Sequence, residues 1–271
     1  MFGGLDFGPA ERDLRDMDIL IALGVCVAIN AIFFVFAAVL HTDKVTDLSY
    51  SISFVVLAVF LLVRGGHYTA LHIVTAVAIF LWGARLGSYL FLRILRTGVD
   101  HRFDDIREHP LRFARFWALQ AVTVWVVMLP ATILFSLPGS AAFPVVSIVG
   151  FALWAIGFAL EEVADGQKSR FRRNPENSGR FIATGLWRYS RHPNYFGESL
   201  LWWGLFIAMI PVFSGWDFLT AIGPVFLTAL LLFVSGVPPL ERSADGKYGG
   251  QPAYRQYKKK TSIFVPLPPR R

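Results

Sequence analysis

The segment from Gly185 to Gly204, GLWRYSRHPNYFGESLLWWG, places polar side chains at the start of an apolar run. We expect a helix to begin at Pro193, because proline fits the first turn, where its missing N–H needs no partner. On that helix Asn194 and Glu198 share a face. An amide and a carboxylate together can hold a carboxamide, such as that of a nicotinamide ring. The alternative interpretation is a helix cap with basic residues at lipid headgroups.

Basic side chains precede this helix in the longest polar segment, residues 165–191. Arginine binds phosphate groups in a bidentate geometry. The candidates for that role are Arg172, Arg173, Arg180, Arg188 and Arg191. Contact with lipid headgroups is the alternative for each of them. Asp165 can accept hydrogen bonds from a ribose, although a plain ion pair explains it equally well. The sequence has no GxGxxG fingerprint, so a nucleotide would be recognised by other means, and no metal site is predicted.

The composition is typical of a membrane protein. Hydrophobic residues make up 55% of the 271 residues and charged residues 17%, with a mean hydropathy of +0.51. The net charge of +7 comes from loops between apolar runs, which membrane orientation and anionic ligands explain better than nucleic acid. The single cysteine, Cys26, excludes an internal disulfide. The acidic N-terminus is unlike a cleaved signal peptide. We therefore expect the first apolar run, residues 19–40, to stay in the mature protein.

The elements that position these residues are apolar runs, most of them as long as the roughly 20 residues that a membrane-spanning helix needs. They predict an all-α, polytopic membrane protein with seven transmembrane helices, over residues 19–40, 48–63, 68–95, 113–137, 143–164, 193–210 and 218–237. The turns at Gly65, Gly139 and Pro211 then share one side with the acidic N-terminus. The basic segments, residues 93–115, residues 165–191 and the C-terminal tail, share the other. The positive-inside rule makes that second side cytoplasmic, with the N-terminus outside and the C-terminus inside.

The segment from Asp165 through FIATGLWRYSRHPNYFGE to Trp203 resembles the C-terminal part of the steroid 5α-reductase family, specifically its bacterial membrane relatives. Sterol C14- and C7-reductases are more distant. In that family the shared part, here roughly the last 110 residues, forms an NADPH site that opens to the cytoplasm. The resemblance implies cofactor contacts at Asp165, Arg172, Arg180, Tyr189, Asn194 and Glu198, with Arg191 and His192 in the same motif.

An RHPxYxG motif also occurs in isoprenylcysteine carboxyl methyltransferases, where it serves S-adenosylmethionine. Arg191, His192, Pro193, Tyr195 and Gly197 fit both families. Asn194 after the proline, Glu198 after the glycine, Trp187 before the motif and the acid at Asp165 look like the reductase version.

The resemblance also implies a catalytic site among the early helices. The steroid reductases use a glutamine-glutamate pair that opens the second helix and a tyrosine on the third. Thr46 and Asp47 align with the pair, and Trp82 aligns with the tyrosine, which is a departure from the pattern. Asp47 and Tyr89 are therefore the candidate catalytic residues. A helix N-cap is the alternative for Asp47, and a packing role is the alternative for Tyr89.

These observations predict an NADPH-dependent reductase that transfers hydride to an activated C=C bond of a lipophilic, steroid-like or isoprenoid substrate. The chain is expected to form one membrane domain in the bacterial inner membrane, with substrate-side helices in residues 1–115 and cofactor-binding elements in residues 143–271. The alternatives are a membrane methyltransferase that uses S-adenosylmethionine and a non-catalytic lipid-binding protein. The expected partners are the bilayer and the substrate, without nucleic acid, and the sequence carries no signal of oligomeric state.

Overall fold

The computed structural model describes residues 9–40, 42, 45–97, 109–138 and 143–270. Within these residues the structure is helical, and its only β interaction is an isolated bridge between Ser190 and Ser262. The all-α prediction is confirmed for this part of the chain. The predicted turn at Gly139 and residues 98–108 of the first basic loop lie outside the described residues.

The described residues contain seven helical segments that are long and apolar enough to cross a bilayer. The prediction of seven spans is therefore confirmed, and the chain is an integral membrane protein. The spans are Arg15–Val39, Thr46–Gly65, Ala70–Leu95, Leu111–Ser136, Val145–Arg173, Pro193–Val212 and Gly215–Tyr248.

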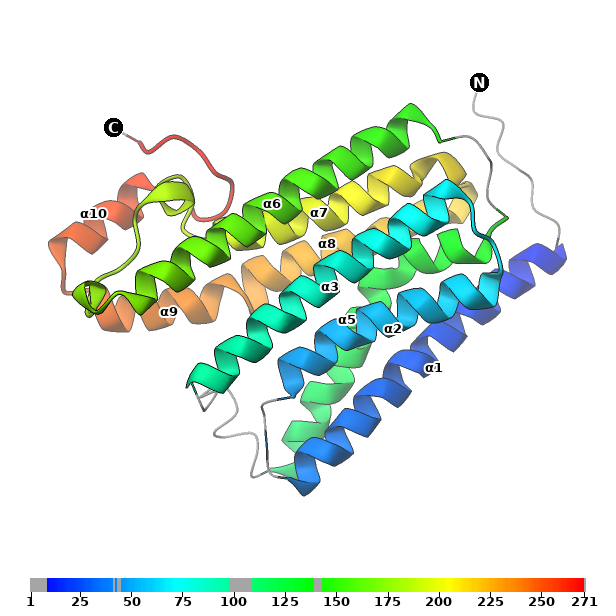
Figure 1. Cartoon of the computed structure of the whole chain (residues 1–271), viewed down its shortest axis with the longest axis horizontal. Helices are drawn as coiled ribbons and strands as arrows, with labels where there is room; N and C mark the ends of the chain where they lie inside the picture. Colours follow the sequence, from blue (N-terminus) through cyan, green and yellow to red (C-terminus); the bar gives the residue numbers. More distant parts are fainter. Residues whose placement is uncertain (1–8, 41, 43–44, 98–108, 139–142, 271) are drawn as a thin grey trace. The chain divides into compact units, whose positions relative to one another are not determined.

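The chain divides into two compact units. Unit 1 comprises Met1–Ser147 and Met209–Gly223, and unit 2 comprises Ile148–Ala208 and Pro224–Arg271. In unit 1, α1 packs against α5 and α2, and α2 also packs against α3 and α5 (Figure 1). The long helices of unit 1 in the described part of the chain are α1 (Pro9–Val39), α2 (Thr46–Gly65), α3 (Ala70–Thr97) and α5 (Pro110–Ser136).

Helix α2 begins one residue before Asp47 and ends at the predicted Gly-Gly turn. Val45 is its N-cap, so the N-cap alternative for Asp47 is wrong. A first-turn carboxylate instead favours the helix through the positive end of its dipole. At the other end, Gly66 adopts the left-handed conformation with φ 68°, which glycine reaches without a side-chain clash. The turn prediction is confirmed.

The interior of unit 1 contains a hydrogen-bond network among side chains of α1, α2 and α5. The amide of Gln120 donates to Asn30 Oδ1 at 2.9 Å and to Ser49 Oγ at 2.8 Å. Asn30 in turn donates to the Cys26 carbonyl and to Ser53 Oγ. These side chains are buried, and buried polar groups need such partners.

In unit 2, helices α6 (Val145–Arg173) and α7 (Pro193–Met209) run side by side (Figure 1). Their contact is made by glycines spaced seven residues apart, Gly150 and Gly157 on α6 and Gly197 and Gly204 on α7. A Cβ on Gly157 would meet the Gly197 carbonyl oxygen at 2.6 Å. Small residues allow this backbone approach, which is common between membrane helices. Helix α7 starts at Pro193, as predicted.

The last span is not one regular helix. A 3₁₀ segment, Gly215–Ala221, leads into α8 (Ile222–Ala229), which continues as a π-helix over Leu230–Val234. Pro238 and Pro239 follow the last apolar run without ending the helical region, because both prolines lie in the first turn of α9 (Val237–Tyr248), where no N–H is required. Helix α10 (Pro252–Lys260) follows.

Candidate functional site

Unit 2 contains a pocket at the end of α6, where the polar segment after α6 meets α9 and α10. Its cavity volume is about 150 Å³, with one side open to solvent, which is below the range of about 300–1,000 Å³ that is usual for ligand sites. The lining residues are Lys168, Phe171, Arg172, Arg180, Phe181, Ile182, Trp187, Arg191, His192, Leu240, Glu241, Ser243, Ala244, Lys247, Tyr248, Tyr254 and Tyr257.

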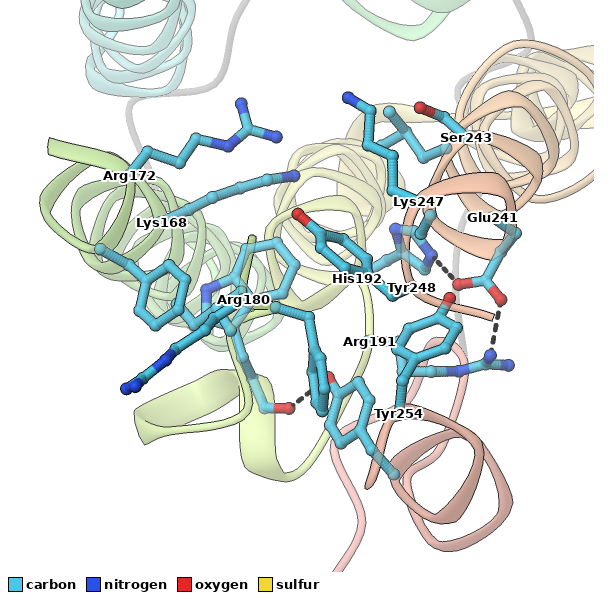
Figure 2. A pocket seen from close by; sticks show the side chains of 17 residues that line it. Lys168, Arg172, Arg180, Arg191, His192, Glu241, Ser243, Lys247, Tyr248 and Tyr254 are labelled. Atoms are coloured by element: carbon cyan, nitrogen blue, oxygen red, sulfur yellow. Dashed lines mark hydrogen bonds and ion pairs between the residues drawn. The ribbon is translucent and has the colours of Figure 1, made fainter. Parts of the chain in front are cut away.

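Basic side chains dominate the charge of this pocket. Lys168 and Arg172 extend from α6, and Lys247 extends from α9 (Figure 2). Arg180 lies in the segment between α6 and α7. Arg172, Arg180 and Lys247 are exposed, and none of the three forms an ion pair within the described part of the chain. Five basic residues therefore line the pocket against one carboxylate, Glu241.

Glu241 is the centre of an ion-pair cluster on one wall of the pocket. Its carboxylate accepts hydrogen bonds from Arg191 Nη1 at 2.5 Å and His192 Nε2 at 2.9 Å, and Lys258 Nζ lies at 3.2 Å. His192 is 4% exposed and stacks on Tyr195. Burial lowers the pKa of His192, and the hydrogen bond and charge of Glu241 offset part of that effect. Neutral His192 then carries its proton on Nε2, since a carboxylate can only accept.

Aromatic rings form another wall of the pocket. The ring of Phe181 lies 5.2 Å from Tyr254 and 5.4 Å from Tyr257. Tyr257 donates to the Trp187 carbonyl at 2.7 Å, and burial raises the pKa of the Tyr257 phenol. The Trp187 indole donates to the Ala164 carbonyl of α6. These bonds fix the segment between α6 and α7 against both α6 and α10, so the aromatic wall is held in place before any ligand binds.

The predicted carboxylate and amide positions lie between α6 and α7. Asn194 Nδ2 donates to Asp165 Oδ1 at 3.2 Å. Asp165 is 5% exposed and Glu198 is 8% exposed. Among the described residues, buried Asn194 Oδ1 has no hydrogen-bond partner. An unsatisfied buried acceptor is costly, and a ligand N–H would satisfy it.

The predicted cofactor residues therefore occupy different places. Arg172, Arg180, Arg191 and His192 line the pocket, whereas Asp165, Asn194 and Glu198 belong to the buried contact of α6 with α7. Tyr189 is 41% exposed and is not a lining residue; its backbone carbonyl accepts from Leu267.

Several lining residues were not predicted, namely Lys168, Glu241, Lys247, Tyr248, Tyr254 and Tyr257. The C-terminal sequence PAYRQYKKK did show tyrosines among basic residues, but this pattern alone does not indicate which side chains face a pocket. Glu241 follows the last apolar run, and its partner His192 is 49 residues away. Local sequence carries no signal for such a distant pair.

The candidate catalytic residues lie in unit 1. Asp47 Oδ2 accepts a hydrogen bond from Arg93 Nη2 of α3 at 3.0 Å. Trp82 is fully buried and packs edge-on against Phe54 at 5.0 Å. The position that aligns with the reductase tyrosine therefore has a packing role. Tyr89, two turns further along α3, is half-buried.

Comparison with known families gives a match over most of the chain. A family model described as "Protein of unknown function (DUF1295)" matches residues 33–261. No solved structure matches the chain.

Two curated relatives were found. An uncharacterized protein of Schizosaccharomyces pombe is 27% identical over 218 residues, which cover 69% of this chain and 60% of that protein. A probable O-methyltransferase of Ustilaginoidea virens is 34% identical over 77 residues, 26% of this chain and 27% of that enzyme. The chain therefore spans less than two thirds of the length of either relative.

Proposed function

The chain belongs to the DUF1295 family, and we propose that it is a membrane reductase that binds NADPH in the pocket of unit 2. The cofactor supplies a hydride, which is transferred to an activated C=C bond of a lipophilic, steroid-like or isoprenoid substrate. The resemblance to steroid 5α-reductases over the last 110 residues supports this reaction class. On this proposal, the positive-inside arrangement places the pocket at the cytoplasmic face of a bacterial inner membrane.

The excess of basic side chains in the pocket carries the proposal. NADPH is a polyanion, with a diphosphate and a further phosphate on one ribose. S-adenosylmethionine, by contrast, has a sulfonium, an ammonium and a carboxylate, so its net charge is positive near neutral pH. Five basic residues against one carboxylate attract the first ligand and repel the second.

The residues that line the pocket fit NADPH at two points. Lys168, Arg172, Arg180 and Lys247 are the residues that would hold its phosphates. The rings of Tyr254, Tyr257 and Phe181 offer a surface on which a base can stack. Asn194 Oδ1 lacks a donor, which the NH₂ group of a nicotinamide carboxamide could supply, but Asn194 does not line the pocket.

The substrate side of the reaction remains assigned to Asp47 and Tyr89. Reduction of a conjugated ketone requires polarisation of the carbonyl and delivery of a proton. Asp47 accepts a hydrogen bond from Arg93, and the phenol O–H of Tyr89 is the group of the two that is a hydrogen-bond donor near neutral pH. The reductase proposal does not depend on this assignment.

A membrane methyltransferase is the second candidate. The observation that favours it is the match of 77 residues to a probable O-methyltransferase. The RHPxYxG motif is compatible with this candidate too, because isoprenylcysteine carboxyl methyltransferases also carry it.

Direct binding distinguishes the two candidates. We would titrate the full chain, purified in detergent, with NADPH and separately with S-adenosylmethionine. The Arg172→Gln/Arg180→Gln variant should bind NADPH at least about tenfold more weakly, because charged hydrogen bonds contribute about 1.5–3 kcal/mol each before solvent screening. Added salt should weaken binding to the wild type more than to the variant.

Arg242→Gln is the matched control. Arg242 is exposed on α9 beside Glu241 but does not line the pocket, so its loss changes net charge without removing a contact. Equal loss of affinity in the control and the double variant would mean that the pocket is not the site. Binding of S-adenosylmethionine with no binding of NADPH would overturn the reductase proposal in favour of the methyltransferase.

A further inference from the structure

The residues after α10 form a segment without helix, Thr261 to Arg270, which we call the C-terminal strap. Backbone and side-chain hydrogen bonds fix it to the residues before α7. Arg191 N donates to the Ser262 carbonyl at 2.8 Å, and Leu267 N donates to the Tyr189 carbonyl at 3.0 Å. Ser190 Oγ donates to the Phe264 carbonyl at 2.6 Å. Three contacts within six residues hold the strap in one register.

The strap has two different faces. The ring of Phe264 packs edge-on against Phe196 of α7 at 5.6 Å. The alternate residues Ile263, Val265 and Leu267 are 42%, 45% and 50% exposed. The residues between them are less exposed, and the chain bends at residues 263–265. The strap therefore uses Phe264 within the fold and presents three aliphatic side chains outward.

The position of the strap relative to a span is set by its hydrogen bonds. Residues 189–191, which hold it, directly precede Pro193, the first residue of the span Pro193–Val212. If the chain enters the bilayer at the start of this span, the exposed aliphatic residues of the strap lie at the level of the membrane–water boundary, where apolar side chains reach the acyl region and basic ones reach the headgroups.

Charge on and around the strap fits that location. Lys259 and Lys260 at the end of α10, Arg270 at the end of the strap, and Arg188 are exposed. Arg270 N donates to the Lys260 carbonyl, which keeps these cations near one another. Basic residues beside an exposed apolar strip are the usual features of a surface that binds anionic lipids.

We propose that the C-terminal strap is a membrane-surface contact, in which Ile263, Val265 and Leu267 insert into the leaflet and the neighbouring basic residues bind anionic phospholipid headgroups. This surface is separate from the pocket and does not depend on which cofactor binds there. It would anchor α10, and with it the aromatic wall of the pocket, to the bilayer.

A site-specific probe tests the proposal in the full chain. The single cysteine, Cys26, is buried, so a Cys26→Ala background allows one new cysteine at a time. Val265→Cys reports on the strap, and Gln256→Cys on the exposed side of α10 is the matched control. Each protein is labelled with a fluorophore and placed in nanodiscs of phosphatidylcholine, with or without phosphatidylglycerol. Quenching is measured with nitroxide-labelled lipid and with aqueous iodide.

The label at position 265 should be quenched severalfold more by the lipid nitroxide than the label at position 256, with the reverse order for iodide. Replacing Lys259, Lys260 and Arg270 by Gln should reduce lipid quenching at position 265 in the anionic nanodiscs and leave it unchanged in the neutral ones. Iodide quenching of both labels alike would show that the strap faces water and would overturn the proposal. A label at position 265 that neither reagent quenches would also overturn it, because a protein partner would then cover the strap.

Discussion

The two units satisfy their buried polar groups in different ways. In unit 1, side chains of different helices bond to one another, as Gln120 does with Asn30 and Ser49. In unit 2, α6 and α7 approach so closely at Gly157 and Gly197 that no side chain fits between them, and polar side chains collect around a pocket at the end of α6.

This difference indicates where each unit can accept a ligand. Hydrogen-bonding capacity that is already used within the fold contributes to stability, whereas capacity without a partner is available for binding. In unit 2 the exposed cations Arg172, Arg180 and Lys247 lack ion pairs within the described residues. We therefore expect changes to the helix contacts of either unit to alter stability first, and changes at the pocket to alter binding first.

The largest effect is expected from Gly157→Ala in unit 2. The new Cβ would lie 2.6 Å from both the Gly197 carbonyl oxygen and Leu201 N, so the two helices must move apart. Overpacking of this kind costs about 1–3 kcal/mol and more where backbone is involved; we expect a loss above about 2 kcal/mol. The free energy of unfolding can be measured by titration with sodium dodecyl sulfate in mixed micelles.

Gly166→Ala on the same helix is the control. Its Cβ would meet only Arg170 Nη2 at 3.6 Å, which is an ordinary contact, and alanine is favoured over glycine in a helix by about 0.5–1 kcal/mol. The two substitutions should therefore change stability in opposite directions. Similar effects from both would show that the close glycine contact does not hold α6 to α7.

A smaller effect is expected from Gln120→Leu in unit 1. It removes two hydrogen bonds and leaves Asn30 Oδ1 without its Gln120 donor. Hydrogen bonds between membrane helices contribute about 0.6 kcal/mol on average and up to about 1.7, so we expect a loss of about 1–2 kcal/mol with unchanged NADPH affinity. Thr123→Val is the control, because within the described part of the chain the Thr123 hydroxyl bonds only to the Leu119 carbonyl of its own helix. A large loss of NADPH affinity in Gln120→Leu would contradict the expectation that changes to the helix contacts of unit 1 alter stability rather than binding.

Much of the fold could be predicted because its signals are local. Apolar runs of sufficient length determine the spans, and Pro193 marked the start of α7 correctly. Pro238 and Pro239 show the limit of such local signals, since proline both follows helices and opens them. A Pro-Pro pair after an apolar run fits either role, and the packing of α9 decides between them.

The pocket could be predicted only in part. Its arginines follow a recognisable motif, but Glu241, Tyr254 and Tyr257 reach the pocket because α9 and α10 fold back against the segment between α6 and α7. The pairing of His192 with Glu241 depends on that return of the chain. Side chains brought together by tertiary packing leave no periodic pattern in the sequence.

The smallest effect concerns His192 and pH. Burial lowers the pKa of His192 in the folded protein, so its contribution to stability is complete above the unfolded pKa of about 6.5 and is lost as the pH falls through the lower folded value. We expect the melting temperature of the wild type to fall by a few degrees more than that of His192→Gln between about pH 7.5 and pH 5. Glutamine can still donate to Glu241, so the variant keeps the hydrogen bond without the titration. Parallel pH profiles for the two proteins would mean that His192 is protonated as readily in the folded as in the unfolded protein, and the polar cluster around Glu241 would then accept an added charge.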